Sequence, residues 1–443
     1  MSKPSIGLVA MASKFESGGQ RSEEILKGAI KHLEEKGLEI HTFEKTVWDP
    51  SDAFKAVEYF SKKQIDLLVM IHITWVLDSL QYIFINNMKC PVILWGVPYA
   101  ETFSIGSVQH FGSILLEHGF NYKYVYGLPE NPSLINEIYG YATTAKIYKK
   151  SRSMKVALLG PRQTWRVAGS QDMSSEEWEF SKTFGVTIIH IEMDEVLELA
   201  AKQETSVVEQ TLSNFKKQDR IGKVVAGEEN IKYAVKVYLA MEEIIKHYTL
   251  DAASAECYPK FSGLVNLASS WLADEGIVID TEGDIAHTFL MTILNQLKPG
   301  PTALAEIGSI KDNILYLAHE GSSAHSIAED ISKVQISASG ELGTFVGTPF
   351  KALPEVTMVD LSGRENTYKM LVTKVSTEQV SNQEWVDGGS KFFAKVNLDD
   401  NAISKFNKML SEGVDHHLLL KEGNLIEQLS DFCKLLKIRR IEI

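Results

Sequence analysis

Two glutamates stand near the ends of predicted strands, where carboxylates could act on a bound ligand. Glu282 belongs to the segment Thr-Glu-Gly-Asp at 281–284, which follows an apolar strand pattern and precedes an apolar helix pattern. Open α/β sheets bind ligands at the carboxyl ends of their strands. Alternatively, Thr281 or Asp284 caps the helix and the acids complement its dipole. The pattern around Glu282 is therefore compatible with a site and with a simple helix cap.

The second glutamate, Glu306, lies in an apolar stretch that follows Lys-Pro-Gly-Pro at 298–301. An acid with alanine, leucine and isoleucine neighbours either faces solvent by strand alternation or is directed into a site. Spacing alone does not decide between these interpretations.

Three histidines also lie at strand ends. His319 ends an apolar strand pattern before Gly321, and His416 and His417 follow Gly413 and precede a run of leucines. A single histidine in such a place is more often structural than functional. Because successive side chains of a strand point to opposite faces, at most one of His416 and His417 can face a given site.

Two carboxylates and one or two imidazoles would suit a divalent cation such as Mn²⁺, with water or ligand oxygens in the open positions. A structural zinc site fits poorly, because no cysteine stands near these residues. In a loop after another predicted strand, Trp165 and Arg166 could bind hydroxyl or anionic groups of a ligand, or could simply pack. The residues themselves thus provide two acids at strand ends and an ambiguous pair of histidines, whose types suit a divalent cation.

The elements that must position these residues form two α/β blocks and a β-rich block. Residues 1–150 alternate short apolar runs with amphipathic segments, the pattern of a parallel sheet with crossover helices. The expected strands of this block are 6–9, 39–42, 67–71, 92–95 and 123–126, and the expected helices are 22–35, 51–63, 77–87, 108–118 and 132–149. The alternation restarts after the polar segment at 149–153.

The second block repeats the alternation, and the third loses it. The expected strands of the second block are 156–159, 186–191, 250–254 and 277–279, with helices at 175–184, 196–203, 207–217, 231–247, 264–275 and 285–297. After about residue 330, β-rich segments separated by glycine and proline predict strands at 334–338, 343–347, 355–361, 369–375 and 392–397, followed by helices at 402–411 and 424–436.

We therefore expect two doubly wound, Rossmann-like α/β domains in series and a β-rich, barrel-like C-terminal domain. The expected boundaries are 1–152, 153–330 and 331–443, with the metal carboxylates in the second domain and the metal histidine in the third.

Composition excludes several classes of protein. The net charge is −13, from 45 Lys and Arg against 58 Asp and Glu, which opposes binding to nucleic acid or anionic membranes. The three cysteines are far apart and provide neither a disulfide framework nor a CxxC pair. We find no signal peptide pattern and no apolar stretch of membrane-spanning length, so we expect a cytoplasmic protein. Nucleotide-binding motifs of the GxGxxG and GxxxxGK[ST] types are also missing.

Taken together, these motifs resemble the L-fucose isomerase and L-arabinose isomerase superfamily. Glu-Gly-Asp at 282–284 is similar to the first metal-binding glutamate motif of the family, and Glu306 to its second metal-binding carboxylate. The strand ending at His319 resembles one that carries a further histidine ligand. Gly-Val-Asp-His-His at 413–417 resembles the metal-binding histidine motif, with His416 as the aligned ligand. The family's sugar-binding histidine of the first domain has no counterpart at the same spot, although Gln109 and His110 lie nearby.

The resemblance implies a metal-dependent aldose–ketose isomerase that acts on a monosaccharide or a charged C6 derivative through a cis-enediolate. It implies Glu282 and Glu306 as catalytic acid and base, the same residues with His416 as metal ligands, and His319 as a further ligand. Substrate contacts would come from Trp165, Arg166, Gln109 and His110. The implied cofactor is Mn²⁺, or another divalent cation such as Mg²⁺ or Co²⁺, and the implied assembly is a hexamer. A non-catalytic sugar-binding protein of two α/β domains is the alternative.

Overall fold

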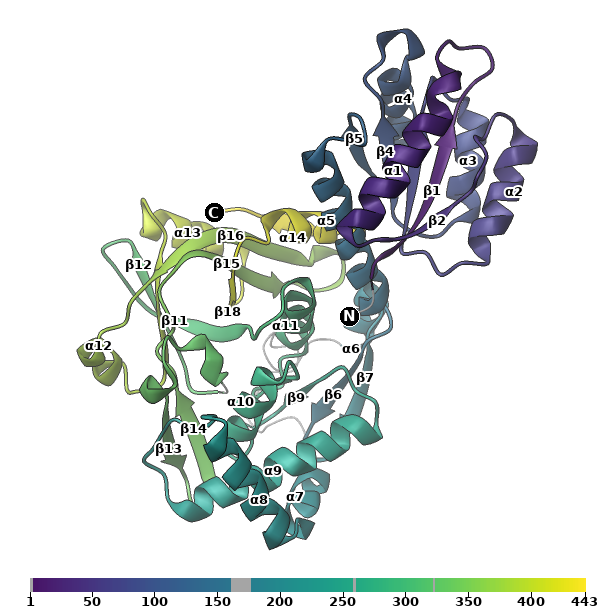
Figure 1. Ribbon diagram of the computed structural model, residues 1–443. Coiled ribbons are helices and arrows are strands. Elements are labelled where there is room, and N and C mark those ends of the chain that lie inside the picture. The colour runs from purple at the N-terminus through teal and green to yellow at the C-terminus, as the bar shows by residue number, and fades with distance from the viewer. Residues whose placement is uncertain (1–2, 161–176, 258–259, 322) are drawn as a thin grey trace. The chain divides into compact units, whose positions relative to one another are not determined.

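The computed structural model describes all residues except 1–2, 161–176, 258–259 and 322 (Figure 1). The chain forms two compact units, Met1–Lys150 and Ser151–Ile443, which are described separately. Among the described residues, no helix is long and apolar enough to cross a membrane.

Unit 1 is a five-stranded parallel sheet with the strand order β2-β1-β3-β4-β5, a doubly wound arrangement. Its strands are β1 (Ser5–Met11), β2 (Glu39–Thr42), β3 (Leu67–His72), β4 (Val92–Gly96) and β5 (Lys123–Tyr126). The connecting helices are α1 (Ser22–Lys36), α2 (Pro50–Ser61), α3 (Asp78–Asn87) and α4 (Ser104–Glu117), and α5 (Pro132–Ser151) follows β5. The central strands β1, β3 and β4 are entirely buried, as expected for a parallel sheet that helices cover on both faces.

Unit 2 begins with a four-stranded parallel sheet of order β10-β9-β6-β7. These strands are β6 (Lys155–Leu159), β7 (Thr187–Ile191), β9 (Ala252–Ala255) and β10 (Val278–Asp280). The helices of this part are α6 (Glu177–Phe184), α7 (Met193–Lys202), α8 (Thr205–Lys217), α9 (Glu228–His247), α10 (Asn266–Asp274) and α11 (Ile285–Leu297).

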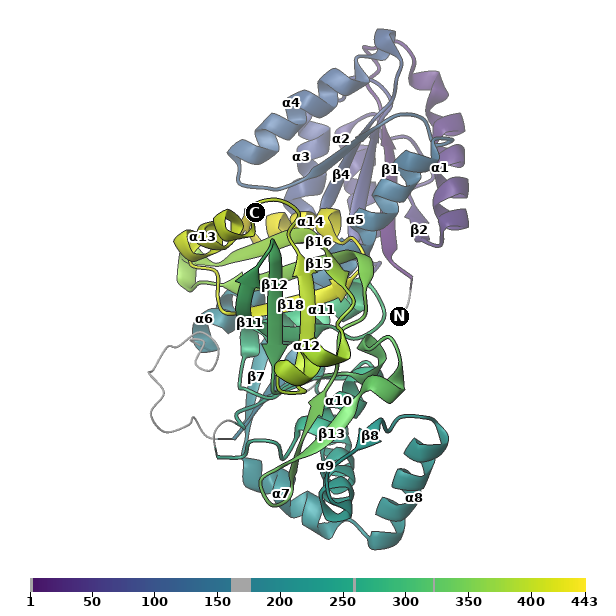
Figure 2. The ribbon, with the colours of Figure 1, turned by 90° about the vertical axis from the view of Figure 1, so that its left-hand side faces the viewer.

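The second part of unit 2 is a seven-stranded sheet that closes into a barrel. Its order is β15-β18-β11-β12-β17-β16-β19, and an additional pairing of β15 with β16 joins the ring. The strands are β11 (Ala303–Lys311), β12 (Ile314–His319), β15 (Leu353–Ser362), β16 (Lys369–Glu378), β17 (Phe392–Asn397), β18 (His417–Glu422) and β19 (Arg439–Ile441). Figure 2 shows β12, β11 and β18 side by side.

A three-stranded sheet of order β14-β13-β8 completes the unit, with β8 (Lys223–Val224), β13 (Gln335–Ser339) and β14 (Gly343–Gly347). The C-terminal helices are α12 (Asn382–Asp387), α13 (Ala402–Glu412) and α14 (Ile426–Leu436). Short 3₁₀ helices lie at Gly19–Arg21, Ala100–Thr102, His325–Ile327, Ile331–Lys333 and Glu365–Thr367.

Helix α11 is the element that joins the two parts of unit 2. It packs against β6, β9 and β10 of the parallel sheet and against β15 and β18 of the barrel. All its residues from Ile285 to Leu294 are buried, as expected for a mostly apolar helix that other elements surround. The carboxyl end of β10 and the start of β18 therefore meet near the N-terminus of the same helix.

The predicted fold class is confirmed, with two parallel α/β sheets and a strand-rich, ring-like C-terminal sheet. The division of the chain into three domains stays a prediction. We note that β11 and β12 of the barrel come from residues before 331, ahead of the expected third boundary.

Candidate metal centre

The turn after β10 fixes the backbone of Glu282. The carboxylate of Asp280, which is buried, accepts hydrogen bonds at Oδ2 from the Glu282 backbone N–H at 3.0 Å and the Asp284 backbone N–H at 2.8 Å. The hydroxyl of Ser254 donates to the same oxygen at 2.7 Å. Gly283 adopts a φ of 79°, a left-handed conformation that glycine takes without strain. The result is a rigid turn that presents Glu282 at the carboxyl edge of the sheet.

Glu306 and His417 are neighbours across two barrel strands. The antiparallel register of β11 and β18 pairs Glu306 with His417, so that both side chains point to the same face. Ala305 and Leu418, which precede and follow them, belong to the apolar core of the barrel. Because side chains alternate along a strand, Glu306 and His417 must point away from that core.

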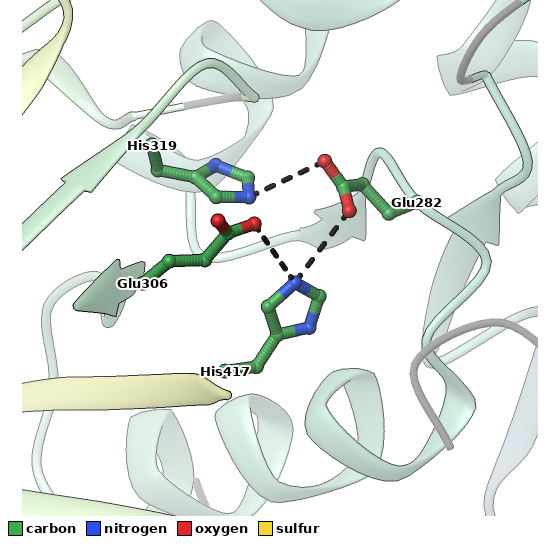
Figure 3. A group of neighbouring side chains, drawn as sticks. All are labelled: Glu282, Glu306, His319 and His417. Atoms are coloured by element: carbon green, nitrogen blue, oxygen red, sulfur yellow. Dashed lines mark ion pairs between the residues drawn. The ribbon is translucent and has the colours of Figure 1, made fainter. Parts of the chain in front are cut away.

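Four side chains converge where these elements meet: Glu282, Glu306, His319 and His417 (Figure 3). One possible ligand atom from each lies within 4.8 Å of the others. His417 Nε2 is 3.5 Å from Glu282 Oε2 and 3.6 Å from Glu306 Oε1. His319 Nε2 is 3.5 Å from Glu282 Oε1. Both imidazoles are buried, whereas the side chain of Glu306 is 45% exposed.

These residues fit a divalent cation. The Nε2 atoms of His319 and His417 are buried and have no hydrogen-bond partner among the described residues, although both face carboxylate oxygens. Separations of 3.5–3.6 Å exceed the usual N–H···O distance of about 2.9 Å and suit donors that share one ion. Two carboxylates and imidazole nitrogen form a donor set suited to Mn²⁺ and similar metals.

His417 has the hydrogen bonding that a metal-binding imidazole requires. Its Nδ1 lies 2.8 Å from Asp284 Oδ2, so that Nδ1 donates and the lone pair of Nε2 is left for a cation. His319 differs, because its Nδ1 accepts a hydrogen bond from the Gly321 backbone N–H at 2.9 Å. A neutral ring that accepts at Nδ1 carries its proton on Nε2, which makes His319 the weaker of the two ligands.

The charges of the group stabilise one another. Burial by itself raises the pKa of Glu282, but its interactions with His319 and His417 outweigh burial and bring the pKa well below its usual value. The nearby imidazole of His417 lowers the pKa of the Glu306 carboxyl, and burial opposes this effect. Burial opposes protonation of His417, yet Asp284, Glu282 and Glu306 together raise its pKa well above the usual range. The metal-free group is therefore a compact set of ion pairs.

The group opens into a cavity of about 400 Å³, a size suited to a small polar ligand. Its lining includes Glu282, Glu306, His319, His416 and Lys391. The lining of the cavity therefore offers both carboxylates, two imidazoles and a lysine to a bound molecule.

The structure separates the two histidines between which the sequence could not choose. His416 lines the cavity, but its side chain is half exposed, its Nδ1 bonds to Asp415 Oδ1 at 2.8 Å, and its Nε2 is 4.0 Å from Glu306 Oε1. His416 does not belong to the converging group, and His417 does. The geometry therefore favours His417 where the resemblance selected His416.

The other predicted contacts lie elsewhere. Gln109 and His110 are exposed residues of α4 in unit 1, where His110 stacks on Trp75 at 5.4 Å between ring centroids and its Nε2 lies 3.3 Å from Asp78 Oδ2. Trp165 and Arg166 lie outside the described residues. Substrate binding by all four remains a prediction.

Sequence reasoning missed the groups behind His417. Asp284 caps α11 through a 2.9 Å bond from the His287 backbone N–H, as the alternative interpretation of the turn expects, and it also accepts from His417. His287, three residues later, is a buried imidazole in a mostly apolar helix, and this Asp-x-x-His spacing was the available signal.

A comparison with curated proteins agrees with the resemblance to the L-fucose and L-arabinose isomerase superfamily that the sequence motifs indicate. The chain is 25% identical to a sulfoquinovose isomerase of Clostridium sp. (strain MSTE9) over 288 residues, which cover 61% of this chain and 62% of the relative. It thus spans about three fifths of the length of the curated relative it matches. No protein-family model matches the chain.

Proposed function

We propose that the protein is a metal-dependent aldose–ketose isomerase. The observation that carries the proposal is the convergence of Glu282, Glu306 and His417, with His319 beside them, at the end of a cavity of about 400 Å³. The similarity to a protein named sulfoquinovose isomerase supports the same reaction class.

In this proposal Glu282, Glu306 and His417 hold a divalent cation, with His319 as a weaker fourth ligand. Mn²⁺ is the expected ion, and Mg²⁺ and Co²⁺ are the alternatives. When bound, the cation would polarise the sugar carbonyl and stabilise the negative charge that develops on the neighbouring oxygens.

The two glutamates would move the protons. Isomerisation transfers a proton between C1 and C2 of the sugar and another between the two oxygens. Each carboxylate can face the metal through one oxygen and use the other to accept or donate a proton, a type of catalysis worth about 10²–10⁴-fold. Glu306, whose side chain is 45% exposed, is the more accessible of the two, and Glu282 is mostly buried.

For the substrate, we propose an aldose with an anionic group at C6. Lys391 is the cationic side chain among the described residues that line the cavity, and it forms an ion pair with Glu320, also of the lining. An anionic tail could replace Glu320 as the partner of Lys391. The name of the curated relative, which refers to sulfoquinovose, agrees with such a substrate.

The test is conversion of sugars followed by NMR. The purified protein, treated with EDTA and then supplied with Mn²⁺, is incubated with neutral aldoses and with C6-sulfonated and C6-phosphorylated aldoses. We expect the ketose to form only after Mn²⁺ is restored, and most rapidly from an anionic aldose. Full activity of the EDTA-treated protein would exclude metal dependence. Binding of a sugar without conversion would instead support a non-catalytic sugar-binding protein.

A hexameric assembly remains a prediction from the resemblance, and a cytoplasmic location remains a prediction from the sequence. Size-exclusion chromatography with light scattering tests the first.

A further inference from the structure

Behind His417 lies a buried row of polar side chains that the proposed chemistry does not use directly. Asp284 Oδ2 accepts from His417 Nδ1 at 2.8 Å and from His287 Nδ1 at 2.6 Å. The other nitrogen of His287, Nε2, lies 3.0 Å from Asp360 Oδ1. Ser362 donates to the second oxygen of Asp360 at 2.7 Å. All of these side chains are at most 2% exposed.

We propose that His287 is a positioning residue that holds the Asp284 carboxylate against His417 and so aims His417 Nε2 at the metal. The inference rests on the proposed metal centre. His287 is not one of the four side chains of the converging group; it bonds to Asp284, and its ring meets the ring of His417 edge to face at 5.6 Å between centroids.

The geometry gives a reason for this role. A carboxylate can rotate about its Cβ–Cγ bond, and one bond from His417 would not fix it. In the observed arrangement one oxygen of Asp284 accepts from both rings, and the other accepts the backbone N–H of His287 at 2.9 Å. The three bonds fix the plane of the carboxylate and, through it, the orientation of His417.

Polar groups in a core are costly unless each is paired, and apolar residues of similar volume often stabilise a fold as well or better. The buried part of helix α11 is apolar apart from His287 and two threonines, Thr288 and Thr292, which donate to backbone oxygens of their own helix turn, yet it places an imidazole between two carboxylates. Both nitrogens of His287 face carboxylate oxygens, so both donate and the ring links Asp284 to Asp360.

Two substitutions of His287 separate its two hydrogen bonds. In His287→Asn the side-chain NH₂ can occupy the position of Nδ1 and keep the bond to Asp284, but the bond to Asp360 is lost. In His287→Gln the side-chain NH₂ can occupy the position of Nε2 and keep the bond to Asp360, but the bond to Asp284 is lost. Isothermal titration calorimetry measures the affinity of the full-length, metal-free protein for Mn²⁺ alone. Thermal unfolding of each variant measures its stability.

His325 provides the matched control. It is also buried in unit 2, and its Nδ1 lies 2.9 Å from the backbone oxygen of Arg220. His325 does not belong to the converging group of metal-binding side chains. His325→Asn and His325→Gln should lower stability and leave Mn²⁺ affinity unchanged at temperatures where the proteins are folded.

We expect His287→Gln to weaken Mn²⁺ binding about 10–100-fold, the usual effect of losing a group that orients a metal ligand, and His287→Asn to weaken it several-fold less. A purely structural role for His287 predicts wild-type affinity for both folded variants, and that result would overturn the proposal. Equal losses in the two variants would overturn it as well, because the bond to Asp284 would then not be the cause.

If neither variant folds, the wild-type protein supplies the test. Mg²⁺ is diamagnetic, and its binding should shift the ¹H–¹⁵N signals of both His417 and His287 if Asp284 links them. An unchanged His287 signal in the Mg²⁺-bound protein would overturn the inference. Absence of any divalent cation binding by the wild-type protein would instead overturn the proposed function itself.

Discussion

Replacement of His417 by asparagine removes Nε2 and keeps a hydrogen-bond donor at the position of Nδ1. The NH₂ group of asparagine can take the position of Nδ1 and preserve the bond to Asp284 Oδ2, which is 2.8 Å in the structure. Nothing replaces Nε2, the atom that lies 3.5 Å from Glu282 and 3.6 Å from Glu306. The substitution therefore tests the metal-binding role of His417 without disturbing the carboxylate behind it.

The size of the effect follows from the position of His417. Removal of a residue that only orients a metal ligand weakens binding about 10–100-fold, and loss of the ligand itself should reach at least the upper end of that range. A 100-fold change in the dissociation constant corresponds to about 2.7 kcal/mol at 25 °C. We expect His417→Asn to lose at least this much affinity for Mn²⁺.

The assay is calorimetric titration of metal-free protein with Mn²⁺, with circular dichroism to show that each variant is folded. The adjacent His416→Asn is the control and should bind within about threefold of wild type, a difference of about 0.6 kcal/mol. His319→Asn should lose less affinity than His417→Asn, because Gly321 donates to Nδ1 of His319 and leaves its proton on Nε2. A large loss in His416→Asn with none in His417→Asn would refute the reasoning and restore the choice made from the sequence.

Three further changes test the catalytic acids, the turn and a buried histidine. Glu282→Gln or Glu306→Gln should lower isomerisation by at least about 10²-fold in an NMR assay, because an amide neither accepts the proton nor carries the charge. Gly283→Ala should destabilise the protein by roughly 1–3 kcal/mol in thermal unfolding, since φ is 79° and the added Cβ would lie 2.4 Å from Glu256 Cγ. Burial lowers the pKa of His72 to about 3. Between about pH 3 and about pH 6.5 the unfolded chain therefore binds one proton more than the folded chain. The free energy of unfolding falls by about 1.4 kcal/mol per pH unit as the pH drops through this range. His72→Asn should therefore lose about 2 kcal/mol less than wild type in urea unfolding between pH 8 and pH 5.

Each of these has an outcome that counts against it. Near-normal turnover by either glutamine variant would remove that glutamate from the mechanism. Wild-type stability of Gly283→Ala would mean that the turn relaxes freely. The control is Gly276→Ala, because Gly276 also has a positive φ but has open space where a Cβ would lie. Comparison of the two variants separates backbone strain from the steric contact. An identical pH dependence in wild type and His72→Asn would show that His72 is not held neutral by burial.

Local patterns in the sequence predicted most of the helices and strands of the fold. The predicted helix at 285–297 coincides with α11, and the strands predicted at 343–347 and 392–397 coincide with β14 and β17. These segments combine apolar periodicity with glycine, proline or capping residues at their ends, and both signals act within a few residues. The two-residue strand β8 and the short helix α12 were not predicted, because neither is long enough to show a period.

The sequence by itself determined the residue types of the site: an acid after a buried strand, a second acid in the next strand, and histidines at two strand ends. It could not choose between His416 and His417, because the leucines that follow are buried whichever face they occupy and show no alternation. Only the tertiary structure shows which of the two imidazoles faces Glu282 and Glu306. The pairing of β11 with β18 places His417 opposite Glu306, and the barrel core takes up Ala305 and Leu418, so the facing direction of His417 is set by long-range strand register, which no local pattern encodes.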